Sequence, residues 1–438
     1  MSSVCIIGAG LSGCEAALVL SSYKINVNLF EMRPQNTTPA HKTDLPAELV
    51  CSNSFKSKEL PSAQALLKTE LKILNSPLIK IAEDSAIPAG KALAVDRNIF
   101  SNKVLQQITR QKNILFKREE IKQIPSGYDY IIIATGPLTS PALTDQIVKI
   151  TNKDSLYFYD AISPIISADS IDFSKVFFAS RWDNNQEDYC NCPFTKEEYE
   201  QFYNELISAK TVPLHNEEKE IYFNACLPLE VIAKRGFLAL AYGPFKPIGL
   251  KNPKTGTRPF AVCQLRKENK EGSCLSLVAC QTRLIYEEQK RIFRMIPGLE
   301  NAEFLRFGSC HRNTYLDSPS VLSDDLSFKN IPNLFVAGQL CGNEGYVESI
   351  ATGNLAAIFI LNRINDKKIK NPPVTTATGA LLKYVTQCPN KPFTPTSFHF
   401  GLLPALDVKY NKLSKKEKHD KLCERALQDL TQWKNEIL

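Results

Sequence analysis

Hydrophobic positions near the N-terminus follow two different periods, which together predict a strand, a helix and a second strand. The segment "VCIIGAG" (4–10) is a short apolar run that ends in glycine, as a buried strand does before a tight turn. In "LSGCEAALVLSS" (11–22) small and apolar residues recur at helical spacing, and "INVNLFE" (25–31) alternates as a strand should. This order of elements opens a Rossmann-like sheet.

Two later segments repeat the glycine-terminated strand, and a long stretch between them has another texture. "YDYIIIATG" (128–136) and "NLFVAGQ" (333–339) read as buried strands, and a helical stretch follows at 346–364. Between them, charged helical stretches such as "TKEEYEQFYNELI" (195–207) alternate with proline-rich turns such as "YGPFKPIGLKNPKTGTRP" (242–259). We therefore predict an α/β fold, in which a large α+β insertion domain interrupts a Rossmann-like nucleotide-binding domain.

Length and charge fit this division. A chain of 438 residues is too long for one compact core. We expect the nucleotide-binding domain at 1–160, the insertion or substrate domain at 161–331, and the rest of the nucleotide-binding domain with a basic tail at 332–438. The formal net charge is +7, and the stretch from Asn362 onward holds 14 Lys and Arg against 7 Asp and Glu. Such a tail suits either phosphate contacts or a solvated helix face.

Composition argues against a membrane or secreted protein. Apolar runs such as "YIIIA" and "LAAIFIL" are far shorter than the roughly 20 residues that span a bilayer. The N-terminus "MSSVCIIGAG" lacks a basic segment ahead of its apolar run, so it does not read as a signal peptide. The 13 cysteines show no framework spacing. We expect a cytoplasmic protein with reduced thiols.

Three glycines at the end of the first strand form a dinucleotide-binding motif. They match G-x-G-x-x-G, and Glu31 closes the second strand 18 residues after Gly13. Glycine here permits a tight turn and close approach to a pyrophosphate at the helix N-terminus, and the acid accepts hydrogen bonds from a ribose. The preceding strand, the following helix and the acid all agree with the motif. The cofactor-binding residues predicted here are Gly8, Ala9, Gly10, Leu11, Ser12, Gly13 and Glu31.

The other glycine-terminated strands favour FAD over NAD. Only one G-x-G-x-x-G is present, at the N-terminus, whereas "IIIATG" and "NLFVAGQ" lie where large flavoproteins place further contacts to FAD. FAD is long enough to cross several strand ends. This reasoning adds Gly136, Gly338 and Gln339 to the predicted cofactor site.

Several longer motifs carry a resemblance to a known family. They are "EMRP", "TPAHKTDLPAELVCSNSFKS", "FNACLPLE", "RMIPGLENAEFLRFGSCHRNTYLDSP", "GQLCGNEGYVESIATG" and "FTPTSFHFGLLP". With the nucleotide motif, the chain closely resembles the bacterial folate- and FAD-dependent tRNA (uracil-5-)-methyltransferases, over nearly its whole length. A related, longer family of flavoproteins that modify the wobble uridine shares "GQLCGNEGYVES" in outline but carries a C-terminal extension.

The resemblance implies an RNA methyltransferase that makes 5-methyluridine at position 54 in the T loop of tRNA. The carbon comes from methylenetetrahydrofolate, and FAD with NAD(P)H supplies the reducing electrons. The implied partners are tRNA and folate. Three alternatives stay open: the same chemistry on a ribosomal RNA uridine, a flavin oxidoreductase acting on a small molecule, and a non-catalytic FAD-dependent RNA-binding protein.

This chemistry requires two reactive groups on the protein. Uracil C5 is a poor nucleophile until a thiolate adds at C6, and a second group must then remove the C5 proton so that the thiolate can leave. The resemblance implies that these groups are Cys51 in "ELVCSNS" and Cys226 in "NACLPLE". We assign Cys226 as the nucleophile and Cys51 as the acid/base partner, and the reverse assignment stays open. A polar loop around Cys51 fits a partly exposed, reactive thiol.

Other residues are weaker candidates. Glu344, ahead of the helical stretch at 346–364, is expected near the flavin. His311 and Arg312 resemble a family segment near the flavin, where His311 could donate to a flavin or folate carbonyl, and Arg283 is expected to pair with folate carboxylates or RNA phosphate. We expect no metal, and we interpret Cys190 and Cys192 as part of a surface loop, because zinc needs more ligands than these two. In the tail, a predicted RNA-contacting cluster comprises Lys409, Lys412, Lys415, Lys416, Lys418 and Lys421, with Tyr410 and Trp433.

Overall fold

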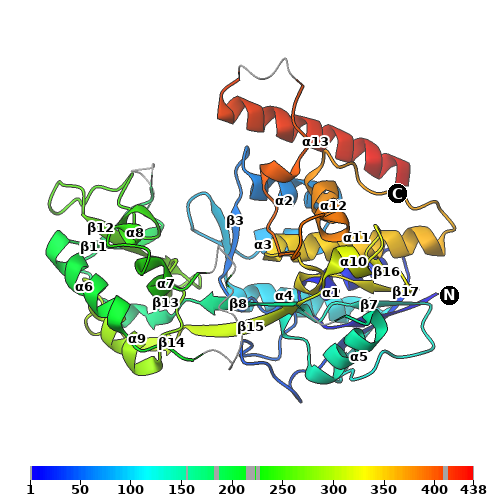
Figure 1. Cartoon of the computed structure of the whole chain (residues 1–438), viewed down its shortest axis with the longest axis horizontal. Coiled ribbons are helices and arrows are strands. Elements are labelled where there is room, and N and C mark those ends of the chain that lie inside the picture. Colours follow the sequence, from blue (N-terminus) through cyan, green and yellow to red (C-terminus); the bar gives the residue numbers. More distant parts are fainter. Residues whose placement is uncertain are drawn as a thin grey trace.

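The chain folds into two lobes joined by a ribbon of two strands. The computed structural model describes residues 2–153, 156–181, 187–213, 222, 227–407 and 413–437, with only the backbone at residue 158. One lobe, the nucleotide-binding lobe, is built on the sheet that contains the first strand of the chain (Figure 1). The other is the insertion lobe. The antiparallel strands β8 (Leu156–Ile162) and β15 (Ser309–Tyr315) run between them (Figure 1).

The first lobe holds a six-stranded sheet of the predicted kind. Its order is β16-β17-β7-β1-β2-β6, parallel except for the edge strand β16. The strands are β1 (Ser3–Ile7), β2 (Asn26–Glu31), β6 (Ile114–Arg118), β7 (Tyr130–Ile133), β16 (Ser327–Phe328) and β17 (Ile331–Val336). The Rossmann-like sheet predicted from the glycine-terminated strands is confirmed, since β1, β7 and β17 are neighbours in it.

Helices cover both faces of this sheet, so alternate residues of β1 enter different cores. Val4 and Ile6 face the core shared with α1 (Leu11–Ser22) and α11 (Tyr346–Ile364). Cys5 and Ile7 face a second core, with α5 (Pro141–Thr151) and α10 (Ser318–Val321). A parallel sheet buried on both faces explains the continuous apolar character of its strands.

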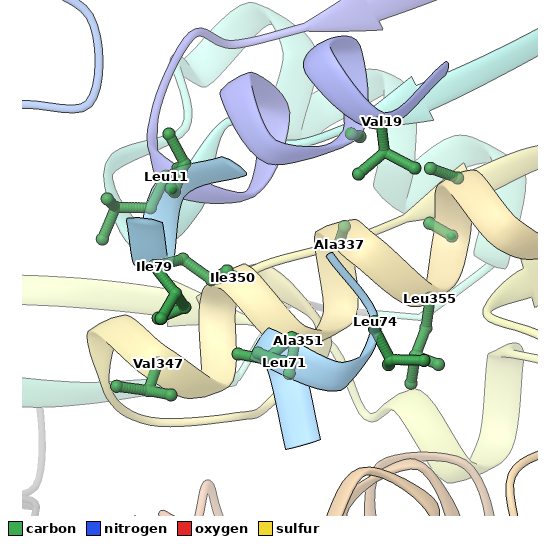
Figure 2. Close-up of a cluster of buried hydrophobic side chains, with 14 of the residues drawn as sticks. Leu11, Val19, Leu71, Leu74, Ile79, Ala337, Val347, Ile350, Ala351 and Leu355 are labelled. Carbon is green, nitrogen blue, oxygen red and sulfur yellow. The ribbon is translucent and has the colours of Figure 1, made fainter. Parts of the chain in front are cut away.

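The first core is completed by helices that lie farther along the chain. Figure 2 shows Leu11 and Val19 of α1, Val347 and Leu355 of α11, and Leu71 of a third helix gathered in one cluster. The additional helices are α2 (Ala63–Ile73), α3 (Pro77–Glu83), α4 (Arg97–Arg110), α12 (Ala377–Gln387) and α13 (Lys415–Ile437). A small sheet, β3 (Ser54–Ser57), β5 (Ala92–Val95) and β4 (Ala86–Ile87), lies beside them.

A buried carboxylate attaches the C-terminal part of the chain to this lobe. Glu70 of α2 is fully buried, and its two oxygens accept hydrogen bonds from the backbone N–H groups of Ala377 (2.6 Å) and Thr378 (2.8 Å). These donors lie in the first turn of α12, where N–H groups lack partners within the helix. Glu70 therefore caps a helix more than 300 residues away along the chain.

The tail helix α13 packs on α2 with one apolar face. Trp433 is 1% exposed, and its indole N–H donates to the carbonyl of Lys370 (2.8 Å). The prediction that Trp433 belongs to an RNA-contacting surface is therefore wrong, because its ring is used in packing. The other predicted aromatic, Tyr410, lies outside the described residues together with Lys409 and Lys412.

The insertion lobe has its own antiparallel sheet and core. The sheet order is β10-β11-β12-β13-β9-β14. Its strands are β9 (Ile165–Ser167), β10 (Phe177–Phe178), β11 (Tyr189–Phe194), β12 (Ala261–Lys267), β13 (Cys274–Leu277) and β14 (Phe304–Arg306). Its helices are α6 (Lys196–Ser208), α7 (Leu229–Ala233), α8 (Ala239–Tyr242) and α9 (Tyr286–Phe293). Aromatic rings such as Phe194, Phe202 and Phe245 fill its core.

The strands of this lobe bear on two predictions, the location of Cys190 and Cys192 and the bounds of the insertion. Cys190 and Cys192 are 1% and 0% exposed in β11, so the prediction of a surface loop there is wrong: alternation along the strand points both thiols into the core. The domain boundaries at 160/161 and 331/332 stay a proposal. Strand pairing favours an earlier end for the insertion, because β16 already pairs with β17.

Within the described residues, none of the helices is long and apolar enough to cross a bilayer.

A glycine in α11 sets how closely this helix approaches α1. An added Cβ at Gly353 would lie 2.3 Å from the backbone oxygen of Ser12, which cannot move without shifting α1. We expect Gly353→Ala to lower the free energy of unfolding by about 1–3 kcal/mol through overpacking, measured by urea denaturation. The exposed helix position Gln106 serves as the control, where Gln106→Ala should change the value by less than about 0.5 kcal/mol. Equal stability of the two variants would contradict the close approach.

Candidate active site

A cleft opens where the parallel strands β1, β2, β7 and β17 end. It holds about 1030 Å³ of space, including the part open to solvent. Eight of the residues predicted to bind the cofactor line it: Gly8, Gly10, Leu11, Ser12, Glu31, Gly136, Gly338 and Gln339. The carboxyl ends of parallel strands are the usual place for nucleotides in open α/β sheets.

The three motif glycines have different physical roles. A Cβ at Gly8, which has φ +102°, would lie 2.6 Å from the oxygen of Ala134, and one at Gly13 would lie 1.9 Å from the oxygen of Gly8. Both positions therefore serve the close packing of strand and helix. At Gly10 an added Cβ would lie 3.9 Å from its nearest neighbour, the oxygen of Ala134, which is an ordinary van der Waals distance, and it would stand at the wall of the cleft. Packing alone does not require glycine at this position, whereas a ligand against the backbone does.

Glu31 is held as a charged acceptor at the end of β2. The N–H of Ala9 donates to its Oε2 (3.1 Å), and the Nε of Arg33 donates to its Oε1 (2.9 Å). Burial disfavours the charge of Glu31, but the hydrogen bonds and charge of Arg33 outweigh it and lower the pKa of the carboxyl. Arg33, itself 2% exposed, also pairs with Glu48 (3.0 Å).

Glu344 lies behind the cleft wall and orients Gln339, which forms part of that wall. The side-chain amide of Gln339 donates to Glu344 (2.7 Å), and Glu344 is 7% exposed. Burial, followed by the nearby charge of Asp160, raises the pKa of the Glu344 carboxyl to about 8. A carboxylic acid in this state is protonated at neutral pH and can donate as well as accept a hydrogen bond.

The loop around Cys51 is fixed at the edge of this cleft. The hydroxyl of Tyr346, a cleft-lining residue at the start of α11, accepts hydrogen bonds from the N–H groups of Cys51 (2.8 Å) and Ser52 (3.1 Å). Guanidinium groups of Arg97 (3.3 Å) and Arg306 (3.2 Å) donate to the carbonyl of Cys51. Cys51 is half-buried, which agrees with the partly exposed thiol predicted from its polar surroundings.

Residues of the insertion lobe take part in this arrangement. Arg306 comes from β14, and Glu268, just after β12, pairs with Arg97 (2.6 Å). The side-chain amide of Asn53 donates to the carbonyl of Lys267 (3.0 Å). The Cys51 loop is therefore held between the two lobes, where a substrate could contact both.

Two histidines from different segments lie near the same cleft. His41 lines it and shares a hydrogen bond with Thr38 (2.6 Å), and burial followed by the charge of Arg33 lowers its pKa to about 4. His311, on β15, bonds to Ser309 (2.9 Å), and burial lowers its pKa too. Both rings are consequently neutral at physiological pH and can serve as hydrogen-bonding groups.

The remaining predicted residues are more scattered. Arg312 lies over the ring of Tyr157 (4.3 Å to its centroid), on the ribbon between the lobes. Arg283 lies in the insertion lobe, where its N–H donates to Glu230 (2.7 Å). Cys226 lies outside the described residues. On either side of it, Tyr222 bridges to Tyr159 of β8, and the N–H of Leu229 donates to Gln281 (2.7 Å).

Sequence reasoning missed several residues that build the site, namely Arg33, His41, Glu48, Arg97, Arg306 and Tyr346. A partial signal existed for Arg33, since an arginine two residues after the acid that ends β2 can turn back onto that acid. For Arg97 and Arg306 no local signal was available, because their role depends on contacts between distant segments. Among the described residues, no cluster of three or more His, Cys, Asp or Glu side chains could hold a metal ion.

Comparison with known proteins identifies the family. The family model for glucose inhibited division protein A matches residues 3–368. The methylenetetrahydrofolate–tRNA-(uracil-5-)-methyltransferase TrmFO of Lawsonia intracellularis is 50% identical over 441 residues, covering 100% of this chain and 98% of the relative. The enzyme of the same name from Persephonella marina is 49% identical over 439 residues, covering 99% of this chain and 100% of the relative.

A solved structure agrees on the fold. Aquifex aeolicus GidA superposes with a TM-score of 0.69 at 17% identity, covering 99% of this chain and 73% of that protein. The predicted α/β fold with its insertion is thereby confirmed. The chain belongs to the glucose inhibited division protein A family and, within it, to the methylenetetrahydrofolate–tRNA-(uracil-5-)-methyltransferases.

Proposed function

We propose that this protein methylates C5 of uridine 54 in the T loop of tRNA, with methylenetetrahydrofolate as the carbon donor and NAD(P)H as the source of electrons. The observation that carries the proposal is the placement of Cys51. Its loop is bound by Tyr346 at the edge of a dinucleotide cleft and by arginines that reach it from both lobes. Cys51 lies beside both the cleft and the junction of the two lobes, which supports a reaction that needs a thiol, a cofactor and a bound substrate together.

Several features of the cleft suit FAD. The space over Gly10 and the free N–H groups at the start of α1 suit its pyrophosphate, and the charged carboxylate of Glu31 suits a ribose hydroxyl. Gln339, oriented by Glu344, would face its distal part. When bound, FAD supplies the electrons that reduce the transferred carbon to the methyl level.

The two cysteines take complementary roles in this proposal. The thiolate of Cys226 adds to C6 of the uracil, which gives C5 the electron density to attack the one-carbon unit, and Cys51 removes the C5 proton so that the sulfur–C6 bond can break. The described residues nearest Cys226 support its approach to the site. Tyr222 is joined to β8, the partner of β15, and four residues span at most about 14 Å.

The neutral histidines and the ribbon residues are proposed to contact the substrates. His311 lies near His41 and Arg306, so it is close to both the cleft and the Cys51 loop. Arg312, on the same strand, presents a cation for a folate carboxylate or an RNA phosphate. Arg283 of the insertion lobe is proposed to bind the same kind of anionic group.

Mapping of 5-methyluridine in tRNA and ribosomal RNA from cells that lack the protein would show which of the two RNAs is the target.

Label transfer tests the reaction itself. We expect purified protein with NAD(P)H and methylene-labelled folate to transfer the label to C5 of uridine 54, detected by nuclease digestion and mass spectrometry of the tRNA. A tRNA with cytidine at position 54 should accept no label. Steady NAD(P)H oxidation without RNA or folate, and no label transfer, would instead favour the flavin oxidoreductase.

Covalent trapping tests the assignment of the cysteines. A tRNA with 5-fluorouridine at position 54 keeps its C5 substituent, so the enzyme–RNA adduct should persist on a denaturing gel. We expect Cys226→Ala to abolish the adduct with flavin content unchanged, whereas Cys274→Ala, at a half-buried cysteine of the insertion sheet, should leave it intact. An adduct that persists in Cys226→Ala and disappears in Cys51→Ala would reverse the two roles.

Substitution at Gly10 tests the cofactor position. We expect Gly10→Val to give colourless protein, because the backbone leaves room for a Cβ at this position but the side chain would occupy the space proposed for the pyrophosphate. The change should lower flavin absorbance by at least about tenfold, while far-UV circular dichroism of the purified protein stays as in wild type. Full flavin content in this variant would refute the placement.

A further inference from the structure

One part of the insertion lobe has an unusual charge pattern. Residues 231–267, hereafter the acid-free segment, contain eight Lys and Arg and no Asp or Glu. The chain as a whole has 46 acidic residues in 438, so a segment of this length would be expected to contain about four. The net charge of the chain is +7, and the segment alone supplies +8. All other residues together therefore carry a net charge of −1.

Most of these cations are available to a partner. Lys234, Arg235, Lys246, Lys251 and Arg258 are exposed. Among the described residues, none of these five side chains forms an ion pair. Elsewhere on the surface, lysines such as Lys72, Lys91 and Lys175 do pair with glutamates. These five cations are thus not compensated by ion pairs, whereas Arg266 of the same segment is buried and pairs with Glu268 (4.0 Å). Exposed cations without such pairs attract polyanions.

Exposed aromatic rings accompany these cations. Tyr242, at the end of α8, is 74% exposed, the most of any large hydrophobic residue among those described. Lys254 donates from its Nζ to the carbonyl of Phe173 (3.0 Å), which brings the acid-free segment beside a stacked pair of exposed rings, Phe173 and Phe178 (centroids 6.0 Å apart). Cations with accessible aromatic faces are the combination that binds unpaired RNA, because phosphates meet the charges and bases stack on the rings.

The position of the segment relates it to the reaction. It begins within α7, five residues after Cys226, so its first cations follow the proposed nucleophile directly along the chain. Figure 1 shows α7, α8 and β12 together in the insertion lobe, whereas α13 lies across the other lobe. A tRNA is large enough to occupy both the cleft and this surface.

The basic tail is a weaker candidate for the same task. Helix α13 has six Lys and Arg but also five Asp and Glu, and Lys421 pairs with Glu424 (2.6 Å). Its one large aromatic residue, Trp433, is buried. A phosphate approaching α13 would meet both signs of charge, so the attraction would largely cancel.

We propose that the acid-free segment, with the Phe173–Phe178 pair, is the surface that anchors the body of the tRNA while its T loop enters the cleft. This inference rests on the proposed function, since it assumes an RNA substrate. The contacts go to phosphates and to one or two unpaired bases, so they provide affinity without reading sequence. An acidic protein partner is the other class of ligand that such a surface could bind.

Neutralising the cations tests the anchor. The variant Lys246→Gln/Lys251→Gln/Arg258→Gln removes three exposed charges whose side chains form no hydrogen bond or ion pair with the described part of the chain. The matched control Lys415→Gln/Lys416→Gln/Lys418→Gln removes three charges from α13. For the first variant we expect at least a tenfold rise in the Kd and KM for tRNA, and a slope of log Kd against log salt that is smaller by about 3. Its kcat at saturating tRNA and its flavin content should stay within twofold of wild type, and the control should match wild type throughout.

The aromatic contribution is tested separately. Tyr242→Ala should weaken tRNA binding about fivefold or more through lost stacking, and Tyr242→Phe, which keeps the ring, should bind as wild type.

Two other results would contradict the proposed role of the acid-free segment in tRNA binding. If the triple variant binds tRNA as wild type does while the α13 control loses affinity, the tail is the anchor. If neither loses affinity, the surface serves another partner, such as an acidic protein. Both results leave the methyltransferase activity of the wild type in place, whereas a wild type that transfers no label to any RNA would remove the proposed function itself.

Discussion

The site depends on the carbonyl of Cys51 being bound from two directions. Arg97 belongs to the nucleotide-binding lobe and Arg306 to the insertion lobe, and both guanidinium groups donate to this one oxygen. Charge-assisted hydrogen bonds of this kind are roughly twice as strong as neutral ones. Glu268 offsets part of the positive charge, and the hydroxyl of Tyr346 accepts from the N–H of Ser52 (3.1 Å), which belongs to the same peptide group as this carbonyl. The Cys51 loop is therefore ordered by the junction of the lobes rather than by its own sequence.

Much of the nucleotide-binding lobe could be predicted from local patterns. The strands at β1, β2, β7 and β17 and the helices α1 and α11 follow from apolar periodicity and from the glycines that end the strands. These signals work because both faces of the sheet are buried, so each strand must be apolar throughout. The same logic failed at Cys190 and Cys192, where a short polar-looking stretch between charged segments is a core strand of the insertion lobe.

The parts of the site that could not be predicted are those made by distant residues. The arginines at 97 and 306 resemble any others in the sequence, and only folding brings them to one peptide. The prediction for Trp433 in the tail was wrong for a related reason. A count of 14 basic against 7 acidic residues does not show that the ring of Trp433 packs into the core, and the acid-free segment lies inside a region that reads as irregular turns.

The cap that Glu70 provides for α12 has a consequence for how the chain can be divided. The shared family model ends at residue 368, before α12 begins. A protein shortened at that point would keep every residue of the cleft wall, yet it would lose the three hydrogen-bond donors of Glu70 and the side chains of α12 and α13, such as Leu381 and Trp433, that complete the first core. Exposing the apolar surface beneath them to water is costly, so the last 70 residues are an internal support of this lobe and not a detachable appendage.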